Sequence, residues 1–458
     1  MARVILVGLL VLPFAALAAE AAPGDGAPRR LLEAGLRSLG AMDLLEELCR
    51  RAPHRLAGSA GGRAAEALAL EWMERFQLQE VRTEGFSVRR WERGAVERVL
   101  LELPGAAAPE ELAACALGGS VGTPDGPVRG RGVELRSLQE AASRAPELQG
   151  RIVFFNRPMD PALPSTFEAY GGAADQRVHG ASASAAQGAV AVLVRSLTLK
   201  ADDEPHTGIL IYREGTPAIP ALALGARSAD RLSEALAAYP DLLLSVESSA
   251  RELAPVDAVN TLGQLTGTER PDEIVVLGCH LDAWDKGCGA HDDAAGCAQV
   301  VEALRLLRDL GEPPRRSIRG VLYMDEEMGG TGGRAYAGNP SRQRETHRYA
   351  IESDRGGFLP VGFSVDAEDP EVLRLRGELL PLLEPLGIRR VERGGGGVDI
   401  GPLRELGCTC LGLVPDSQRY FDVHHANSDV PAAVHPRELE LGAVALAVVA
   451  RHLANRED

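Results

Sequence analysis

The sequence is poor in cysteine, in lysine and in long hydrophobic runs, and each shortage excludes a class of protein. Seven cysteines among 458 residues do not make a disulfide scaffold, and their odd number leaves at least one thiol free or paired between chains. Cys408 and Cys410 lie two residues apart on an expected strand, where they share a face but are poorly placed for a bridge.

Only the N-terminus carries a hydrophobic run. Val4 to Leu17 is apolar, follows Arg3, and is followed by small residues suited to cleavage, so residues 1–21 are predicted to be a signal peptide. The alternative is an uncleaved membrane anchor, but the run is short for a span. We therefore expect a secreted or periplasmic protein with no stable membrane insertion after signal cleavage.

Positive charge is also scarce. The 49 basic residues are outnumbered by 65 acidic ones, which gives a formal net charge of −16. Such a surface repels phosphate backbones and anionic lipid, which argues against nucleic acid as a partner. The 45% hydrophobic and 25% charged residues are typical of a soluble globular protein, and the length predicts two or three domains.

Three regions differ in their patterns. Within residues 28–100, apolar positions recur at helical spacing over about 30–52 and 61–77. Residues 101–255 carry short β-like runs separated by glycine, proline and aspartate, with no cluster of metal ligands or nucleophiles. We expect this middle region to be an inserted, β-rich domain that shapes access of the substrate.

Strand and helix signals alternate from residue 256 to residue 458. Strands are expected at Glu273–Leu277, Arg319–Met324 and Tyr349–Ser353, and helices at Gly296–Leu310 and Glu438–Leu453. The alternation predicts an α/β fold with a mixed, largely parallel sheet flanked by helices. In such sheets ligands bind at the carboxyl ends of the strands.

Imidazole and carboxylate side chains occur at five points that follow these strands or lie in loops. The points are His280 with Asp282, Asp292–Asp293, Glu326–Glu327, Asp354, and His424–His425. Each alone is more often a turn, a helix cap or a surface ion pair. Together, in this order, they predict a site for zinc or a related divalent ion. The set contains no cysteine, which favours a hydrolytic site over a structural one.

The chemistry of paired metal ions explains why these residue types are needed. Two cations about 3.5–4 Å apart need one carboxylate that bridges them, and the water between them is acidified. A further carboxylate must take the proton and deliver it to the leaving amine. Glu326 and Glu327 can divide these tasks if the turn directs one to the metal and one to the water.

The chain resembles the co-catalytic two-zinc aminopeptidase family, in particular its carboxypeptidase Q (plasma glutamate carboxypeptidase) branch. The segments that carry the resemblance are Gly278–Asp285, Gly289–Gly296, Asp325–Met328, Ile351–Gly356, His424–Asp429 and, in the middle region, Pro205–Gly208 and Ile219–Leu222. The resemblance covers nearly all of the chain after residue 21. Departures are Ala294–Ala295, where the family has glycines, and Val430, where it usually has threonine.

The resemblance implies a role for each candidate residue. One zinc ion would be held by His280 and Asp354 and the other by Glu327 and His425, with Asp292 bridging both and Glu326 as general base and then acid. Asp282 would hydrogen-bond His280 from outside the metal site, and His424 would stabilise the oxyanion. A cis peptide bond between Asp292 and Asp293 is also implied.

The resemblance also implies a fold and an activity. The fold would be a zinc-exopeptidase domain, residues 28–100 and 256–458, interrupted by a protease-associated insertion at 101–255. The activity would use two zinc ions per chain and act on small peptides. An aminopeptidase or a dipeptidase, and a homodimer, are compatible with it. A glutaminyl-cyclase-like acyl transferase shares the fold but lacks the insertion, and a silent receptor or binding module would lose ligands that are all present here.

Overall fold

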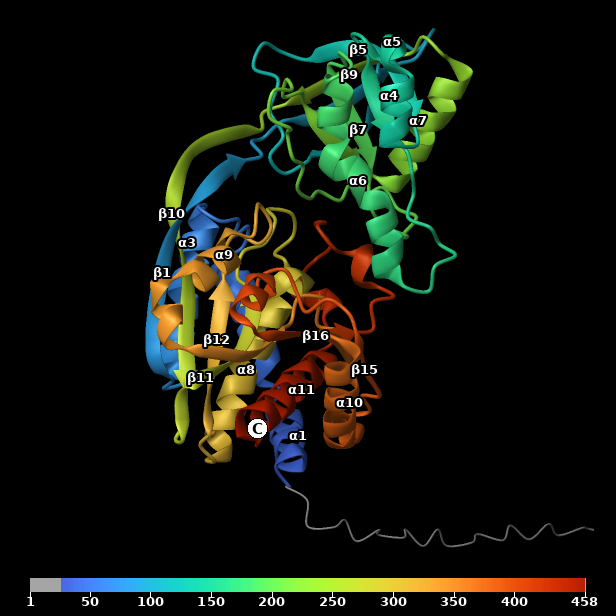
Figure 1. Cartoon of the computed structure of the whole chain (residues 1–458). Helices are drawn as coiled ribbons and strands as arrows, with labels where there is room; N and C mark the ends of the chain where they lie inside the picture. Colours follow the sequence, from blue (N-terminus) through green and yellow to red (C-terminus); the bar gives the residue numbers. More distant parts are fainter. Residues whose placement is uncertain (1–25, 458) are drawn as a thin grey trace, which may run out of the picture.

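The computed structural model describes residues 26–457, which form two units, each built on its own sheet (Figure 1). The inserted unit comprises residues 97–248, and the main unit comprises the rest of the described chain. Two long paired strands, β1 (Gln79–Glu92) and β10 (Arg251–Leu265), run from the main sheet towards the inserted unit. The predicted signal peptide lies outside the described residues.

The main unit is built on an eight-stranded mixed sheet with the order β1-β10-β12-β11-β13-β16-β14-β15. Four of its seven strand pairs are parallel, which confirms the predicted α/β fold with a largely parallel sheet. The remaining strands are β11 (Arg270–His280), β12 (Arg316–Tyr323), β13 (Thr346–Glu352), β14 (Pro360–Asp366), β15 (Arg390–Arg393) and β16 (Thr409–Pro415).

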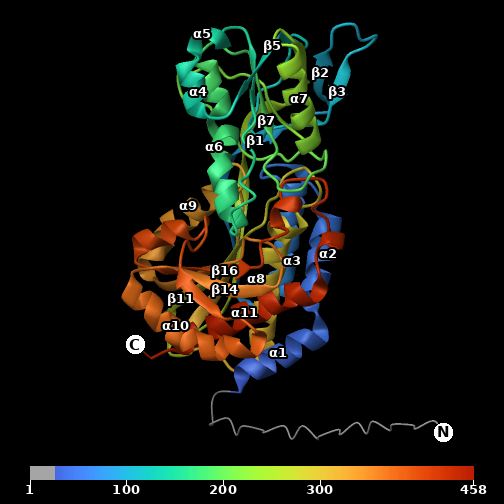
Figure 2. The same cartoon turned by 90° about the vertical axis from the view of Figure 1, so that its right-hand side faces the viewer.

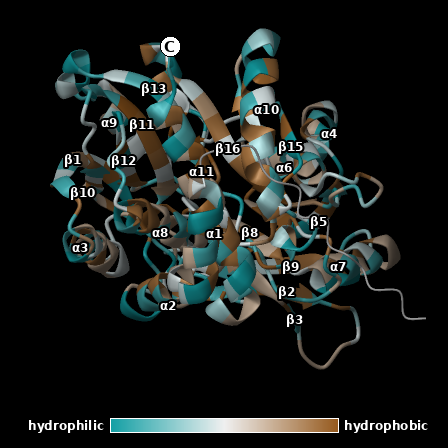
Figure 3. Cartoon of the chain, turned by 90° about the horizontal axis from the view of Figure 1, so that it is seen from below, coloured by the Kyte–Doolittle hydropathy of each residue, from teal (hydrophilic) through white to brown (hydrophobic). Residues whose placement is uncertain are grey.

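Helices cover both faces of this sheet. One face packs against most of them, namely α1 (Ala27–Ser38), α2 (Gly40–Arg51), α3 (Ala60–Arg75), α8 (Ala295–Leu310), α10 (Asp369–Leu383) and α11 (Pro436–Asn455). The other face packs against α9 (Thr331–Gly338) and the short helix η4 (Gly401–Leu406). Val275 and Leu277 face the first layer, whereas Ile274 and Val276 face the second, because side chains alternate across a strand. The central strands are accordingly hydrophobic on both sides, as β11 and β16 show in Figure 3.

The continuous helix expected over about 30–52 is broken at Leu39. This residue adopts a left-handed conformation with φ 50°, which ends α1 and begins α2. The break lets α1 pack on α11 while α2 packs on α8. The sequence does not reveal this break, because the apolar positions keep their helical spacing on both sides of it.

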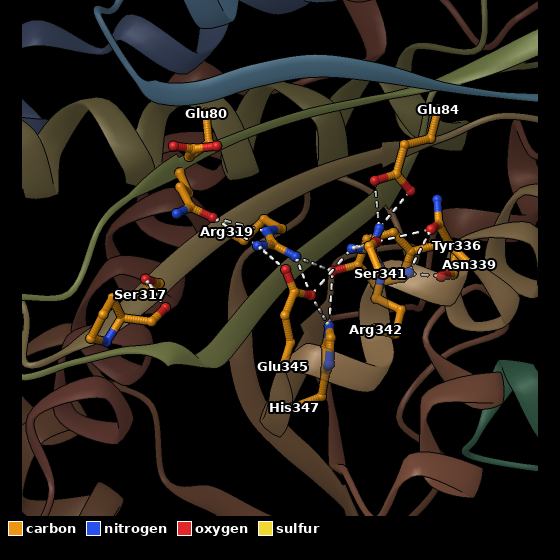
Figure 4. A network of polar contacts seen from close by, with 12 residues as sticks. Glu80, Glu84, Ser317, Arg319, Tyr336, Asn339, Ser341, Arg342, Glu345 and His347 are labelled. Atoms are coloured by element: carbon orange, nitrogen blue, oxygen red, sulfur yellow. Dashed lines mark hydrogen bonds and ion pairs between the residues drawn. The ribbon is translucent and has the colours of Figure 1, made fainter.

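A network of buried ion pairs holds β12 and the short helix η2 (Pro340–Arg344) against β1 (Figure 4). Arg319 on β12 pairs with Glu345 at 2.9 Å, and Arg342 on η2 pairs with Glu84 on β1 at 2.5 Å. Each of these buried guanidinium groups therefore has a carboxylate partner, as burial of charge requires.

The inserted unit has a second mixed sheet with the order β3-β2-β9-β5-β6-β7-β8-β4. Its strands are β2 (Glu97–Glu102), β3 (Glu110–Leu112), β4 (Ala114–Ala116), β5 (Val128–Leu135), β6 (Ile152–Phe155), β7 (Ala191–Arg195), β8 (Ala221–Leu224) and β9 (Leu243–Ser248). β6, β7 and β8 lie in the region of short β-like runs that the sequence showed between residues 101 and 255. The assignment of this unit as a protease-associated domain stays a prediction.

Four helices flank the second sheet: α4 (Leu138–Ser143), α5 (Ala145–Leu148), α6 (Thr166–Ala185) and α7 (Ala226–Ala238). The longest, α6, extends from the inserted unit to the main unit (Figure 2). At its start, Thr166 donates a hydrogen bond to the carbonyl of Ser417 at 2.9 Å, and Phe167 stacks on Tyr420. Among the helices within residues 26–457, none has the length and apolarity needed to cross a bilayer.

Candidate metal centre and active site

The carboxyl ends of the main strands bring the five predicted ligands together. Strand β11 ends at His280. The Nε2 atom of His280 lies 3.2 Å from Asp292 Oδ1 and 3.2 Å from Asp354 Oδ1. The Nε2 of His425 lies 3.1 Å from Asp292 Oδ2 and 3.3 Å from Glu327 Oε2. Asp292 therefore presents one carboxylate oxygen to each of two imidazoles, and each imidazole has a second carboxylate beside it.

His424 lies beside the second of these groups. Its Nε2 is 3.5 Å from Asp292 Oδ2, and its ring stacks on that of His425 with 3.5 Å between the centroids. Two sets of side chains are compact enough to hold a cation, one made of His280, Asp292 and Asp354, the other of Asp292, His424 and His425. Both sets share Asp292.

The loop that carries Asp292 is fixed by two other carboxylates. Asp429 accepts hydrogen bonds from the main-chain N–H groups of His291, at 2.7 Å, and of Asp292, at 3.2 Å. Asp293 accepts from the N–H of His280 at 3.1 Å and from that of Gly296 at 2.9 Å. The peptide bond between Asp292 and Asp293 is cis, as the resemblance implied. This loop thus joins the end of β11 to the start of α8.

Asp282 acts differently from the expectation, which assigned its side chain to His280. The Nδ1 of His280 lies 3.1 Å from the main-chain carbonyl of Asp282, whereas the carboxylate of Asp282 is 3.8 Å away. The carboxylate instead accepts the N–H groups of Asp325, Glu326 and Glu327 at 2.9, 3.2 and 3.3 Å. The carboxylate therefore positions the turn that carries the proposed base, because a carboxylate can accept several main-chain donors at once.

The inserted unit supplies the main-chain contacts that orient His425. The Nδ1 of His425 lies 3.3 Å from the carbonyl of Thr207, and the N–H of Thr207 donates to the carbonyl of His425 at 3.0 Å. The neighbouring His206 places its Nδ1 2.7 Å from the carbonyl of His424. Segment 204–208, which we call the strap, thus fixes the ring so that Nε2 faces Asp292. No local pattern in the sequence indicates this role, although Pro205–Gly208 carries part of the resemblance.

The electrostatics of the cluster favour a bound cation. Burial, and then the charge of Asp292, raises the pKa of Glu327 to about 7. Burial opposes the protonation of His425, but Glu327 and Asp292 outweigh it and raise its pKa to about 9. Burial also raises the pKa of Glu326 well above its ordinary value, and the charges of Asp354 and Glu327 add to this effect. Burial and the neighbouring carboxylates therefore disfavour ionisation of these acids unless a cation balances their charge.

The donor set fits a divalent metal. Imidazole nitrogens and carboxylate oxygens converge without any thiol, which is the ligand chemistry of catalytic zinc. The Oε1 atom of Glu327 is buried and has no hydrogen-bond partner within residues 26–457. A buried carboxylate oxygen without a donor is costly unless a cation satisfies it.

A pocket of about 360 Å³ opens onto this cluster. Residues of the main unit line one side of it, including Asp292, Glu326 and Glu327. Helix α6 of the inserted unit supplies another wall through Phe167, Tyr170 and Arg177. The volume is at the small end of the range for ligand pockets, roughly 300–1,000 Å³.

Two buried acids near the site were not singled out by the sequence. Glu352, at the end of β13, accepts the N–H groups of Val398 and Ile400 at 2.9 Å each. Asp399 between them is buried, with no hydrogen-bond partner for either oxygen in the described chain. The glycine run before Val398 was the only signal for this loop, and it indicates a turn rather than a role.

The comparisons with known proteins agree with this geometry. The family model of peptidase family M28 matches residues 260–449. Carboxypeptidase Q of Mus musculus is 32% identical over 404 residues, which are 88% of this chain and 83% of the relative. The crystal structure of a peptidase M28 precursor from Shewanella amazonensis SB2B superposes with a TM-score of 0.88 at 31% identity and covers 94% of this chain and 96% of that one.

A zinc aminopeptidase from Bacillus subtilis, at 18% identity and a TM-score of 0.65 over 92% of this chain and 98% of that one, shares the fold. These matches favour the peptidase over the acyl transferase and the silent binding module. Identity above 30% over most of both chains, together with the strand-end cluster, establishes the family: the chain belongs to peptidase family M28, the metallopeptidase family that its motifs resemble.

Proposed function

We propose that the protein is an exported exopeptidase that uses two zinc ions per chain to hydrolyse small peptides. One ion is assigned to His280 and Asp354 and the other to Glu327 and His425, with Asp292 shared. The arrangement of Asp292 carries the proposal, because its two oxygens face two different imidazoles at 3.2 and 3.1 Å. A carboxylate that bridges two cations has this geometry.

The inserted unit is proposed to be the protease-associated domain of the branch that the sequence resembles. It closes one side of the pocket through α6 and supports His425 through the strap. A pocket of about 360 Å³ suits the end of a short peptide better than the middle of a long one. Export by cleavage of residues 1–21 and association as a homodimer rest on the sequence pattern and on the resemblance.

Bound zinc ions would acidify water and polarise the carbonyl of the scissile bond. The side chain of Glu326 faces the same pocket and would take the proton of the water and pass it to the leaving amine. The Asp282 carboxylate fixes the turn of Glu326 through three main-chain N–H groups, so the base does not depend on a flexible loop.

His424 would contribute a further hydrogen bond. Burial, together with the charge of His425, lowers the pKa of His424 well below its ordinary value, which favours a neutral ring. A neutral imidazole that lines the pocket can donate one N–H to the oxygen on which negative charge develops.

Substitution of the proposed base tests the function directly. Glu326→Gln should lower kcat roughly 10²- to 10⁴-fold, because proton transfer is lost, while the metal content of the purified protein stays at two ions per chain. Glu74→Gln, on the exposed face of α3, is the matched control. Normal turnover by Glu326→Gln would reject the assigned base, and full activity in a protein stripped of metal would reject the metal site itself.

A further inference from the structure

Six of the seven cysteines lie in three close pairs within the main unit, and all seven carry free thiols. The two thiols of each pair are hydrogen-bonded to each other, and the pairs are Cys49 with Cys288, Cys279 with Cys297, and Cys408 with Cys410. The inserted unit contains only Cys115, on β4. Each pair is therefore a candidate for a disulfide, and their surroundings distinguish them.

The pair formed by Cys49 and Cys288 is the best suited to oxidation. These two residues are 239 positions apart in the chain and are 7% and 8% exposed, so a reagent in solution can reach them. The other two pairs are less suitable. Cys279 and Cys297 are completely buried, whereas Cys408 and Cys410 lie two residues apart at the start of β16, a spacing that is poor for a bridge.

The geometry gives the two sulfurs different chemical roles. Cys49 lies in the last turn of α2, and its Sγ is 3.6 Å from the carbonyl oxygen of Cys288, which lies in the loop between β11 and α8. The hydrogen bond that Cys49 donates to the Cys288 sulfur raises the pKa of Cys49 and lowers that of Cys288. Cys288 is therefore the better nucleophile, and Cys49 is placed to attack a sulfur that becomes attached to it.

The loop that contains Cys288 also carries Asp292, the residue shared by both metal groups. The N–H of Cys288 donates to the carbonyl of Asp429 at 3.0 Å, and the Asp429 carboxylate accepts the N–H of Asp292. Arg55, in the turn after α2, donates to three carbonyls of the same loop. A covalent link to Cys49 would thus fasten the loop where the segment around α2 already holds it.

We propose that Cys49 and Cys288 form a disulfide that braces the loop of Asp292 when the protein meets an oxidant that itself contains a disulfide. The Cys288 thiolate attacks one sulfur of that oxidant, and the other sulfur leaves as a thiolate. Cys49 then loses its proton and attacks Cys288, which releases the second sulfur of the oxidant. The two protein sulfurs lose two electrons, and the oxidant is reduced to two thiols that take up the two protons. The proposal rests on the proposed function only because export would supply such an oxidant.

Mass spectrometry of the whole protein tests the bridge directly. After treatment with oxidised glutathione and denaturation, the wild-type protein should be lighter by two hydrogen atoms, and five of its seven thiols should still react with iodoacetamide. Proteolysis should yield one cross-linked peptide pair that contains Cys49 and Cys288. Cys408→Ser is the matched control, since it removes a thiol from another pair, and it should form the same bridge. Seven reactive thiols, or a bridge between other cysteines, would overturn the proposal.

Two variants test the order of the reaction and the effect of the bridge. In Cys49→Ala the reaction should stop at a mixed disulfide between glutathione and Cys288, whereas Cys288→Ala should react much more slowly at Cys49. Equal rates would overturn the assigned nucleophile. Because the bridge closes a long loop in the unfolded chain, the Tm of the oxidised wild-type protein should be about 3–6 °C above that of the reduced protein, with no difference in Cys49→Ala. A bridged protein with an unchanged Tm would overturn the bracing role.

Failure of the proposed function would give a different result. Glutathione replaces the oxidant of the export compartment, and the mass of the protein reports on the bridge without metal or substrate. Chelation and Glu326→Gln should abolish hydrolysis of leucyl-alanine in the oxidised and the reduced protein alike. Activity that survives both treatments would reject the metal mechanism, whereas the count of reactive thiols reports on Cys49 and Cys288 alone.

Discussion

The two units contribute to the site through different kinds of structure. In the main unit, His280 ends β11 and Asp354 follows β13 by two residues, so the sheet itself places the ligands. In the inserted unit, Arg177 lies on a helix and Thr207 in irregular chain, and neither position is fixed by a sheet. The strand ends therefore position the proposed metal ligands, and the insertion supplies part of the pocket wall.

The inserted unit is nevertheless joined firmly to the main unit. Arg93, the residue after β1, donates a hydrogen bond to the hydroxyl of Thr207 at 3.2 Å, and Lys286 pairs with Glu97 on β2 at 2.9 Å. Glu204 in the strap accepts the N–H of Ser428 at 2.8 Å. The contacts of Glu204 and Thr207 reach the loop that bears His424 and His425, so the position of the second imidazole depends on both units.

The largest effect should follow from a change at the strand-end cluster. Asp292→Asn removes the charge of the only side chain shared by both metal groups, so the protein should lose most of its bound metal. We expect kcat/KM to fall at least about 10³-fold, since the metal contributes several kcal/mol. Metal analysis and dipeptide assays measure both effects, with Asp241→Asn on the exposed surface of the inserted unit as control. Retention of two ions by Asp292→Asn would contradict the bridge.

A smaller loss of activity should follow from a change at Asp282, which positions the turn that carries Glu326. Asp282→Asn replaces an acceptor of three N–H groups by an amide that can accept through one oxygen only. Because supporting residues of metal sites typically contribute 10- to 100-fold, we expect kcat to fall roughly 100-fold with little loss of metal. A loss of metal without a fall in turnover per bound metal would instead assign Asp282 to His280.

The sequence predicted the strands and candidate ligands of the main unit better than it predicted the contribution of the inserted unit. Short continuous apolar runs predicted β11, β12 and β13, and apolar positions at helical spacing predicted α8 and α11. Both patterns can be read from neighbouring residues alone. The five candidate ligands stood out because imidazole and carboxylate side chains follow successive strands in this order. Their geometry agrees with the prediction, but their roles as ligands stay a proposal.

The features that the sequence did not predict depend on contacts between residues that are distant in the chain. The glycine- and alanine-rich helix α6 carries no apolar stripe of helical period, and the charge of Arg177 resembles that of any surface arginine. The three N–H groups that Asp282 accepts come from residues more than 40 positions away. A pattern confined to neighbouring residues contains no information about such partners.

The strap offers a test of the inserted unit's contribution to the cluster. Gly208→Ala would bring a methyl group to 2.6 Å from Arg177 Cζ and 2.8 Å from His425 Nδ1, at a residue with φ +131°. We expect kcat/KM to fall roughly tenfold, because a small displacement of a positioned group already slows the reaction. Gly215→Ala has a left-handed φ of +79° but no atom within 4 Å, so it matches the backbone strain without the clash. Equal activity of the two variants would show that His425 does not need the strap.

The smallest effect, on stability alone, asks whether the two units unfold together. Ser59 caps α3 of the main unit by accepting the N–H of Gly62 at 2.9 Å, and Ser137 caps α4 of the inserted unit by accepting that of Glu140 at 3.1 Å. Each serine-to-alanine change should cost about 1 kcal/mol with activity unchanged. Because contacts such as the Lys286–Glu97 ion pair join the units, we expect a single denaturation transition that both variants shift alike. Two transitions, with each variant shifting only one, would mean that the insertion folds independently of the cluster it helps to hold.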